Sequence, residues 1–409
     1  MRIELITTGD ELVTGQLVDT NGPWLMDRLF ALGEQVARKV AVGDDLEAIA
    51  AALREAAARA DLVIVSGGLG PTLDDLTVDA ACTAFGREPV VDEAQLERLR
   101  RIFERLGRAL TPNNERQARV PSGAEVLGNE FGTATAFALR EGGCTLYFLP
   151  GVPRELKGLC EAHVFPRIRA LHEAAGIHRC YRAVKCYGIP ESHMDQAVRP
   201  LLARHPHVRY GTRTIFPENH VKLLAEGTTE DEARARCEAL EREVRAALGR
   251  AVFGGADDTF PGATLAALHG RGWKVCFAES LTAGAAAALL AEAPGASEVL
   301  LGSSVVYATE LKERWLGVPA ALIEREGVVS EACAAAMAEG ALRASGADVA
   351  VALTGYAGPG PGPDGLPSGT VCAAIAGAGP TRARTRHLPF GRNEVRRAAA
   401  YLALELLRR

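Results

Sequence analysis

A serine at the end of a predicted strand is the first residue whose setting suggests chemistry. The stretch AESLTAG, residues 278–284, places Ser280 between an apolar strand and a helix rich in small residues. Serine at such a position commonly caps the helix, so a structural role is the simpler interpretation. As a nucleophile, Ser280 would need a neighbouring base to take its proton. The choice between the two roles depends on whether the sequence supplies that base.

A lysine is the best-placed candidate for the base. The C-terminal third contains two histidines, His269 and His387, and neither has the spacing of a Ser-His-Asp triad. A lysine can take the proton where burial lowers its pKa enough to populate the neutral amine. Tyr307 ends a predicted apolar strand and Lys312 follows at a turn into a helix, so we expect both at the sheet edge that carries Ser280. In the alternative, the tyrosine is a core-edge aromatic and the lysine is solvated.

Three further features of the C-terminal third suit a phosphate or a developing oxyanion. The glycine-dense stretch 353–365 follows a predicted strand, so its backbone amides can face an anion. A helix expected to open near residue 282 offers free N–H groups, and an arginine precedes the last helix. The resulting candidates for substrate binding are Thr282, Gly284, Thr354, Gly358 and Arg392. Together these features predict a pocket for a phosphate-bearing substrate beside a Ser/Lys pair.

A second set of polar residues lies in the N-terminal third. The stretch SGGLGPTLDDLT, residues 66–77, follows a buried strand, and its glycines let backbone N–H groups approach a phosphate. Its two aspartates are placed to hold a divalent metal that bridges phosphate oxygens. The candidates are Asp10, Gly67, Gly68 and Gly70 for a nucleotide, and Asp74 and Asp75 for the metal. The pattern is neither G-x-G-x-x-G nor a P-loop, and turn glycines with helix-capping aspartates are the alternative.

The elements that must position these residues indicate an α/β protein. Strands alternate with helices over the first ~170 residues and again from about residue 257, which predicts parallel βαβ units. Between these two regions the sequence pattern changes and predicts two strands around a turn, followed by a charged helix. We expect two α/β domains with mainly parallel sheets joined by a small α+β module, over residues 1–172, 255–409 and 173–254 respectively.

Composition excludes several classes of protein. The 409 residues are 48% apolar and 24% charged, as in ordinary globular proteins. The net charge of −5 argues against general binding to nucleic acid. No run of about 18 apolar residues and no signal segment is apparent, so we expect a cytoplasmic protein without a membrane partner. Nine cysteines without a C-x-x-C pair predict reduced core thiols and no zinc site.

The motifs resemble those of the CinA family. The stretches that carry the resemblance in the N-terminal and middle parts are TTGDEL, SGGLGPTLDDLT, LPGVPREL and YGIPESHMDQAV. Those in the C-terminal part are AESLTAG, GSSVVYATELK, EGVVSEACAAAMAEGAL, TGYAGPGPG and GRNEVRR. The resemblance implies a molybdopterin-binding-like N-terminal domain that hydrolyses ADP-ribose with a divalent metal (Mg, Mn or Co), with K as an additional candidate. It implies a C-terminal nicotinamide mononucleotide deamidase that needs no cofactor.

The resemblance also implies residue roles. Ser280 would be the nucleophile, Lys312 its base, Tyr307 a helper in proton transfer or amide positioning, and Arg392 a substrate-binding residue. The expected partners are a pyridine nucleotide and ADP-ribose, and we expect a homodimer. The alternative is a nucleotide-binding regulatory or competence-related scaffold with one or both sites inactive.

Two stretches depart from the family pattern. In NEFGTATAF, residues 129–137, Thr135 and Ala136 replace a Pro-Gly pair, which questions the activity or substrate preference of the N-terminal domain. In SLTAG, Leu281 replaces a cysteine and Ala283 a glycine. We expect the leucine to be tolerated and the alanine to narrow the approach to the helix start.

Overall fold

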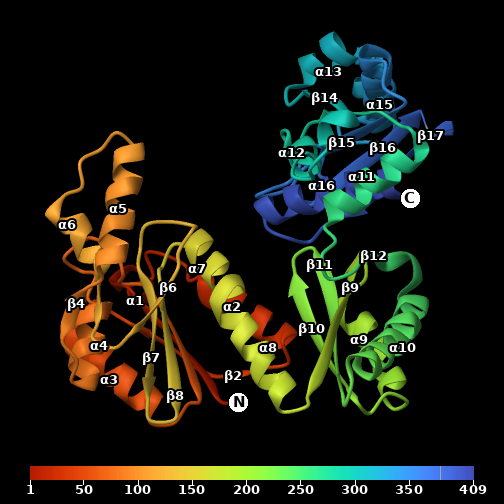
Figure 1. The fold of residues 1–409 in the computed structure, drawn as a ribbon. Coiled ribbons are helices and arrows are strands. Elements are labelled where there is room, and N and C mark those ends of the chain that lie inside the picture. Colours follow the sequence, from red (N-terminus) through yellow and green to blue (C-terminus); the bar gives the residue numbers. More distant parts are fainter. Residues whose placement is uncertain (378) are drawn as a thin grey trace. The chain divides into compact units, whose positions relative to one another are not determined.

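The computed structural model describes residues 1–377 and 379–409 (Figure 1). These residues form two compact units. The first comprises Met1–Tyr181, His207–Arg209 and Leu224–Glu238, and the second comprises Arg182–Pro206, Tyr210–Leu223 and Ala239–Arg409. Within the described residues, no helix is long and apolar enough to cross a membrane.

A six-stranded sheet forms the centre of the first unit. In sheet order its strands are β2 (Val36–Val42), β1 (Ile3–Thr8), β3 (Leu62–Ser66), β8 (Cys144–Leu149), β7 (Ala136–Glu141) and β6 (Glu125–Leu127). The first four run parallel. Helical crossovers connect β1 to β2 and β2 to β3, whereas β8 directly follows β7 in a hairpin. β7 and β6 complete the sheet in antiparallel pairs. The carboxyl ends of β1 and β3 therefore lie at one edge, where the glycine-rich stretch begins.

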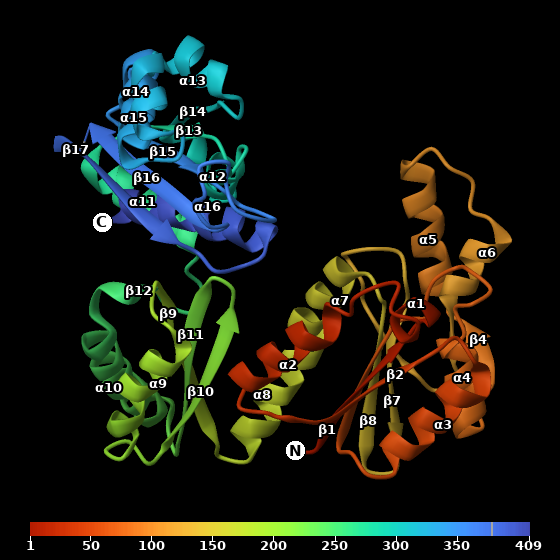
Figure 2. The ribbon, with the colours of Figure 1, turned by 180° about the vertical axis from the view of Figure 1, so that it is seen from behind.

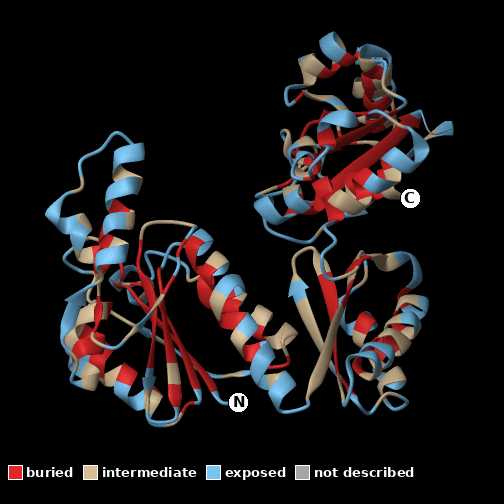
Figure 3. Cartoon of the chain, in the orientation of Figure 1, coloured by how far each residue is buried: buried red, intermediate tan, exposed pale blue. Residues whose placement is uncertain are grey.

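Helices cover both faces of this sheet, as Figure 1 and the reverse view in Figure 2 show. On one face lie α2 (Asn21–Ala31), α7 (Pro153–Leu159) and α8 (Phe165–Ala174), and on the other lie α3 (Leu46–Ala57) and α4 (Thr77–Phe85). The remaining elements are α1 (Asp10–Val13), β4 (Pro89–Val91), α5 (Glu93–Arg105), α6 (Pro112–Glu115) and β5 (Arg119–Pro121). The buried residues concentrate on the strands and on the inner helix faces (Figure 3).

A smaller sheet with two helices follows along the chain. Its strands, in sheet order, are β10 (Val208–Ile215), β11 (Glu218–Gly227), β9 (His178–Tyr187) and β12 (Val252–Gly254). Its helices are α9 (Glu191–Leu202) and α10 (Glu230–Leu248). We call these elements the middle module. The turn between β10 and β11 holds Phe216 and Pro217, and residues Tyr210–Leu223 of this hairpin belong to the second unit.

The C-terminal sheet has five strands with a mixed pattern. In sheet order they are β14 (Leu300–Val305), β13 (Val275–Glu279), β15 (Val349–Gly355), β16 (Thr370–Gly377) and β17 (Gly379–His387). β13 pairs in parallel with both of its neighbours, whereas β16 pairs antiparallel with β15 and β17. The fold class predicted from the sequence, with two α/β domains, is confirmed. The antiparallel half of this sheet was not part of that prediction.

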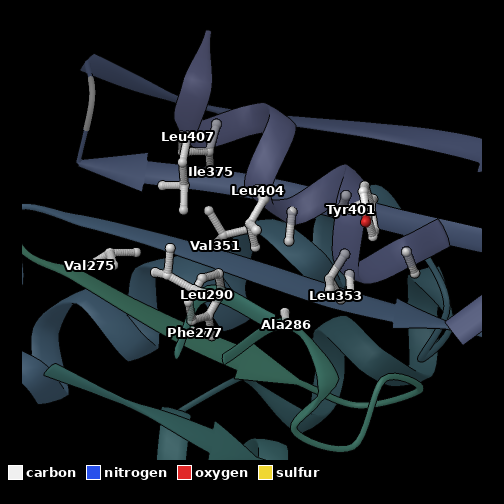
Figure 4. Packing of buried hydrophobic residues seen from close by; sticks show 14 of the residues in the cluster. Val275, Phe277, Ala286, Leu290, Val351, Leu353, Ile375, Tyr401, Leu404 and Leu407 are labelled. Atoms are coloured by element: carbon white, nitrogen blue, oxygen red, sulfur yellow. The ribbon is translucent and has the colours of Figure 1, made fainter. Parts of the chain in front are cut away.

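Two helical layers sandwich the C-terminal sheet. One face packs against α11 (Phe260–Arg271), α12 (Ala285–Ala291) and α16 (Arg392–Arg408), and the other against α13 (Thr309–Leu316), α14 (Ala320–Glu326) and α15 (Glu331–Ser345). Alternate β13 residues serve the two cores: Phe277 lies among Leu290, Val351 and Leu404 (Figure 4), whereas Cys276 and Ala278 face α15. Burial of each large apolar side chain contributes about 1.5–3 kcal/mol, so this core holds the end of β13 in place.

The loop after β13 differs from the prediction. The helix expected to open near residue 282 begins at Ala285, three residues later. The strand expected to end at Tyr307 ends at Val305. Ser330 caps the helix that begins at Glu331, because its side chain accepts a hydrogen bond from the Cys333 N–H at 3.1 Å.

Candidate active site

Ser280 and Lys312 meet at the carboxyl end of β13. Ser280 follows the last residue of that strand, and its N–H donates to the Leu353 carbonyl on β15 at 2.9 Å. Lys312 lies on α13 and is only 1% exposed. Its Nζ lies 3.1 Å from Ser280 Oγ. The structure therefore brings the predicted nucleophile and the predicted base into direct hydrogen-bond contact.

The surroundings of Lys312 suit the neutral amine. Burial lowers the pKa of Lys312, because desolvation disfavours the ammonium form. Besides the serine, Nζ contacts two carbonyl oxygens, those of Val306 at 2.9 Å and Tyr307 at 3.4 Å. A neutral amine has two N–H groups and one lone pair. When both carbonyls accept an N–H, the lone pair is directed at the Ser280 hydroxyl, which is the arrangement a general base needs.

A cavity of about 290 Å³ opens over this pair. Its lining includes Ser280, Lys312, Tyr307, Thr354, Gly358 and Arg392, all of which the sequence predicted as site residues. Among its described lining residues there is no aspartate or glutamate, whereas Arg392 is cationic. The cavity is therefore electrostatically suited to an anionic group.

Arg392 links two walls of the cavity. One guanidinium nitrogen, Nη2, donates to the Tyr307 hydroxyl at 3.1 Å, and Nη1 donates to the Gly358 carbonyl. Tyr307 is 56% exposed, so its ring is held by this contact rather than by burial. The Thr354 hydroxyl, by contrast, is buried and donates to the Val328 carbonyl at 2.9 Å. Its oxygen can still accept a hydrogen bond from a ligand.

The anion site expected at residues 282–284 is already filled by the protein itself. The Glu279 carboxylate is fully buried and accepts hydrogen bonds from the N–H groups of Gly284, Ala286 and Ala287, at 3.0, 3.0 and 3.1 Å. It also accepts from the Ser303 hydroxyl at 2.9 Å. A substrate anion cannot use these donors. The predicted substrate-binding role of Gly284 is therefore wrong.

Thr282 does not contact the cavity either. It is fully buried, does not line the cavity, and its carbonyl accepts from Arg396 Nη2 at 3.1 Å. The N–H of Leu281 is a better candidate for an oxyanion donor. It follows Ser280 directly, its residue lines the cavity, and among the described residues it has no hydrogen-bond acceptor. In α/β-hydrolases, the N–H of the residue after the nucleophile has this function.

A second cavity, of about 380 Å³, lies at the carboxyl ends of β1 and β3. The glycines predicted to bind a nucleotide, Gly67, Gly68 and Gly70, line it. Gly67 has φ +116°, and a Cβ there would lie 2.5 Å from the Thr8 carbonyl oxygen, so only glycine fits. Five carboxylates also line the cavity, from Glu11, Asp44, Asp74, Asp75 and Glu155, and none of its described lining residues is a lysine or arginine.

The predicted metal pair does not fit a divalent ion. The Asp75 carboxylate accepts from the N–H groups of Gly70 and Thr72, each at 2.8 Å, and from the Thr72 hydroxyl. Both of its oxygens therefore already hold the loop, and Asp74 is exposed. Among the described residues, no group of three or more His, Cys, Asp or Glu side chains is placed to hold a metal.

Asp10 also has a local structural role. Its N–H donates to Asp44 Oδ2 at 2.9 Å, and the Asp44 N–H donates back to Asp10 Oδ1 at 3.0 Å. Asp10 does not line the cavity, whereas its hydrogen-bond partner Asp44 does. Burial, together with the negative charges of Asp10, Glu11 and Asp74, raises the pKa of Asp44.

Comparisons with known proteins cover the whole chain. Three family profiles match: Probable molybdopterin binding domain over residues 4–170, Damage-inducible protein CinA KH domain over 181–254, and CinA C-terminal domain over 258–409. A CinA-like protein of Anaeromyxobacter dehalogenans is 47% identical over 413 residues, which span 100% of this chain and 99% of the relative. One of Myxococcus xanthus is 45% identical and covers 100% of this chain and 98% of its own length. The chain belongs to the CinA family.

Solved structures of CinA proteins match part of the chain. That of CinA from Thermoplasma acidophilum, a protein of unknown function by its description, is 36% identical and covers 41% of this chain and 97% of its own, with a TM-score of 0.38. A competence-damaged protein (CinA) superfamily member from Escherichia coli is 34% identical and covers 37% of this chain and 92% of its own, with a TM-score of 0.36.

The two departures from the CinA pattern have different structural settings. Ala283 has φ +51° and is the only non-glycine residue in the described chain with a left-handed backbone, so the alanine occupies a conformation that favours glycine. Thr135 is 2% exposed, its hydroxyl finds no partner among the described residues, and Ala136 begins β7. Glu279 was not among the residues predicted from the sequence, although a carboxylate near the start of a helix is a recognised stabilising signal.

Proposed function

We propose that the C-terminal domain hydrolyses the carboxamide of nicotinamide mononucleotide to give nicotinic acid mononucleotide and ammonia. The observation that carries this proposal is the buried Lys312 amine, whose Nζ lies 3.1 Å from Ser280 Oγ and also contacts the carbonyls of Val306 and Tyr307. A helix-capping serine would have no need of a desolvated lysine. Membership in the CinA family supplies the choice of substrate.

In the first step, Ser280 Oγ attacks the carboxamide carbon while Lys312 takes the hydroxyl proton. The carbonyl oxygen becomes an oxyanion, and the Leu281 N–H is placed to stabilise it. One such donor typically contributes about 3 kcal/mol to the transition state. The positive charge of the pyridinium ring makes the carboxamide carbon more electrophilic.

In the second step, the C–N bond breaks and the Lys312 ammonium returns its proton to the leaving nitrogen, which departs as ammonia. Water then attacks the acyl-serine, Lys312 again takes a proton, and nicotinic acid mononucleotide leaves as Ser280 is restored. Arg392, which lines the cavity, would bind the phosphate. The cavity, about 290 Å³, lies at the small end of ligand sites and suits a mononucleotide better than a dinucleotide.

For the N-terminal domain we propose nucleotide binding at the glycine-rich loop, with ADP-ribose as the candidate ligand. The loop glycines at the carboxyl ends of β1 and β3 support this. We derive no hydrolytic step there, because Asp75 does not fit as a metal ligand. A cytoplasmic homodimer is part of the same proposal, and light scattering on the purified protein tests the dimer.

The deciding experiment is ammonia release from nicotinamide mononucleotide by the wild-type protein beside Ser280→Ala and Lys312→Arg. We expect turnover in the wild type and none in either variant, because an arginine cannot act as the base. Full activity in Lys312→Arg would contradict the neutral-lysine role. A folded wild type that binds nucleotides in calorimetry without releasing ammonia would favour the regulatory scaffold instead.

A further inference from the structure

We propose that the β10–β11 hairpin of the middle module positions Arg392 for the substrate phosphate, with Phe216 as the key positioning residue. The inference rests on the proposed function of the C-terminal site. It assigns the middle module a part in substrate binding by that site. Residues Tyr210–Leu223 of the hairpin and the C-terminal domain belong to the same compact unit, so the contacts between them lie within that unit.

The first contact lies next to Arg392. Phe216, in the hairpin turn, meets Phe390 edge-on, with ring centroids 4.8 Å apart and an interplanar angle of 75°. Phe390 precedes Arg392 by two residues, in the segment between β17 and α16. Phe390 is still 42% exposed, so the hairpin ring covers part of a side chain that the domain itself leaves open. This contact restrains the segment that enters α16.

The second contact lies further along α16. The Tyr401 hydroxyl donates to Glu218 Oε1 at 2.8 Å, and His220 Nε2 lies 2.8 Å from the other carboxylate oxygen. Tyr401 is 5% exposed, and its ring stacks on Phe260 with centroids 4.9 Å apart. The hairpin thus contacts α16 both just before its first turn and near its middle.

The restrained helix begins with the residue that lines the cavity. Arg392 is the first residue of α16, and its guanidinium contacts Tyr307 and Gly358 across the cavity. A bound phosphate needs that guanidinium in one place, and a side chain that must be ordered on binding weakens affinity. The hairpin therefore acts on substrate affinity through Arg392, without touching the reacting atoms.

This arrangement predicts a specific kinetic signature. Arg392 would bind the phosphate equally in the ground state and the transition state, so loss of its positioning raises KM and leaves kcat unchanged. From the coupling typical of one aromatic pair, Phe216→Ala should raise KM for nicotinamide mononucleotide about three- to tenfold. Phe216→Tyr keeps the ring and should restore the wild-type KM.

A matched control separates this role from general packing. Phe253 of β12 also contacts the C-terminal domain, edge-on to Phe260 with ring centroids 5.1 Å apart. Phe260 stacks on Tyr401, so this contact lies at the middle of α16 rather than beside Phe390. Phe253→Ala should leave KM unchanged provided that thermal unfolding shows it to be folded. In an Arg392→Ala background, Phe216→Ala should have no additional effect, because the two changes act through one contact.

The experiment compares nicotinamide mononucleotide with nicotinamide riboside, which lacks the phosphate. We expect Phe216→Ala to lower kcat/KM for the mononucleotide and to leave that for the riboside unchanged. An equal loss for both substrates, or no change for either in an active enzyme, overturns the inference. The Kd of the mononucleotide for Ser280→Ala, with and without Phe216→Ala, gives the same comparison without turnover. If the wild type neither binds nor hydrolyses the mononucleotide, the proposed function fails instead.

Discussion

Replacing Ala283 with glycine should stabilise the C-terminal domain. Ala283 lies in the turn after Ser280 with φ +51°, where a Cβ atom crowds its own backbone. Its side chain is exposed, so the methyl group contributes little buried apolar surface. The substitution therefore removes a strained contact without opening a cavity.

The expected gain follows from two opposing effects. A non-glycine residue in the left-handed region costs about 1–2 kcal/mol. Glycine adds entropy to the unfolded chain, which costs about 0.4–1 kcal/mol. The net effect is a stabilisation of about 0.5–1 kcal/mol, which corresponds to a rise of roughly 2 °C in Tm for a domain of this size.

The adjacent glycine provides the matched control. Gly284 has φ +95°, and the nearest atom to an added Cβ is Val305 Cγ2 at 3.8 Å, so an alanine there has room but an unfavourable backbone. Gly284→Ala should lose about 1 kcal/mol or more. Urea unfolding followed by circular dichroism measures both variants against the wild type. A loss of stability in Ala283→Gly, or none in Gly284→Ala, would refute the assignment of strain to this turn.

Three further predictions concern buried or hydrogen-bonded charges. Burial lowers the pKa of Lys312, so between the lowered and the ordinary lysine pKa the unfolded chain binds more protons than the folded chain, and stability rises with pH over that range. Lys312→Met should therefore stabilise the protein more at pH 7 than at pH values near 11, as urea unfolding at both would show, and it should abolish the proposed ammonia release. Glu279→Gln should destabilise the domain by about 1–3 kcal/mol, since an amide oxygen can serve Gly284 and Ala286 but its NH2 group then faces the Ala287 N–H, and an unchanged unfolding midpoint would contradict this. Asp75→Ala should weaken ADP-ribose binding in calorimetry by freeing the 70–72 loop while ammonia release from the C-terminal site stays at the wild-type rate, and EDTA should not alter that rate.

The sequence by itself determined the fold class and the pairing of Ser280 with Lys312. Alternating apolar strands and helices predict parallel α/β sheets, and strands of such sheets end at a common edge. Because Ser280 and Lys312 both follow strand ends, their approach was predictable from spacing. The shortage of well-placed histidines pointed to the lysine, and the structure places its Nζ 3.1 Å from the serine hydroxyl.

Only the tertiary structure decided which polar groups remain free for a ligand. Gly284 and Asp75 have suitable types and positions for anion and metal binding, but Glu279 and the 70–72 loop already satisfy them. Whether a polar group is already hydrogen-bonded depends on which groups the folded chain brings next to it, and the residue type alone does not give that information. The same holds for Lys312, because the carbonyls that orient its amine belong to Val306 and Tyr307 and would be present with any side chains there.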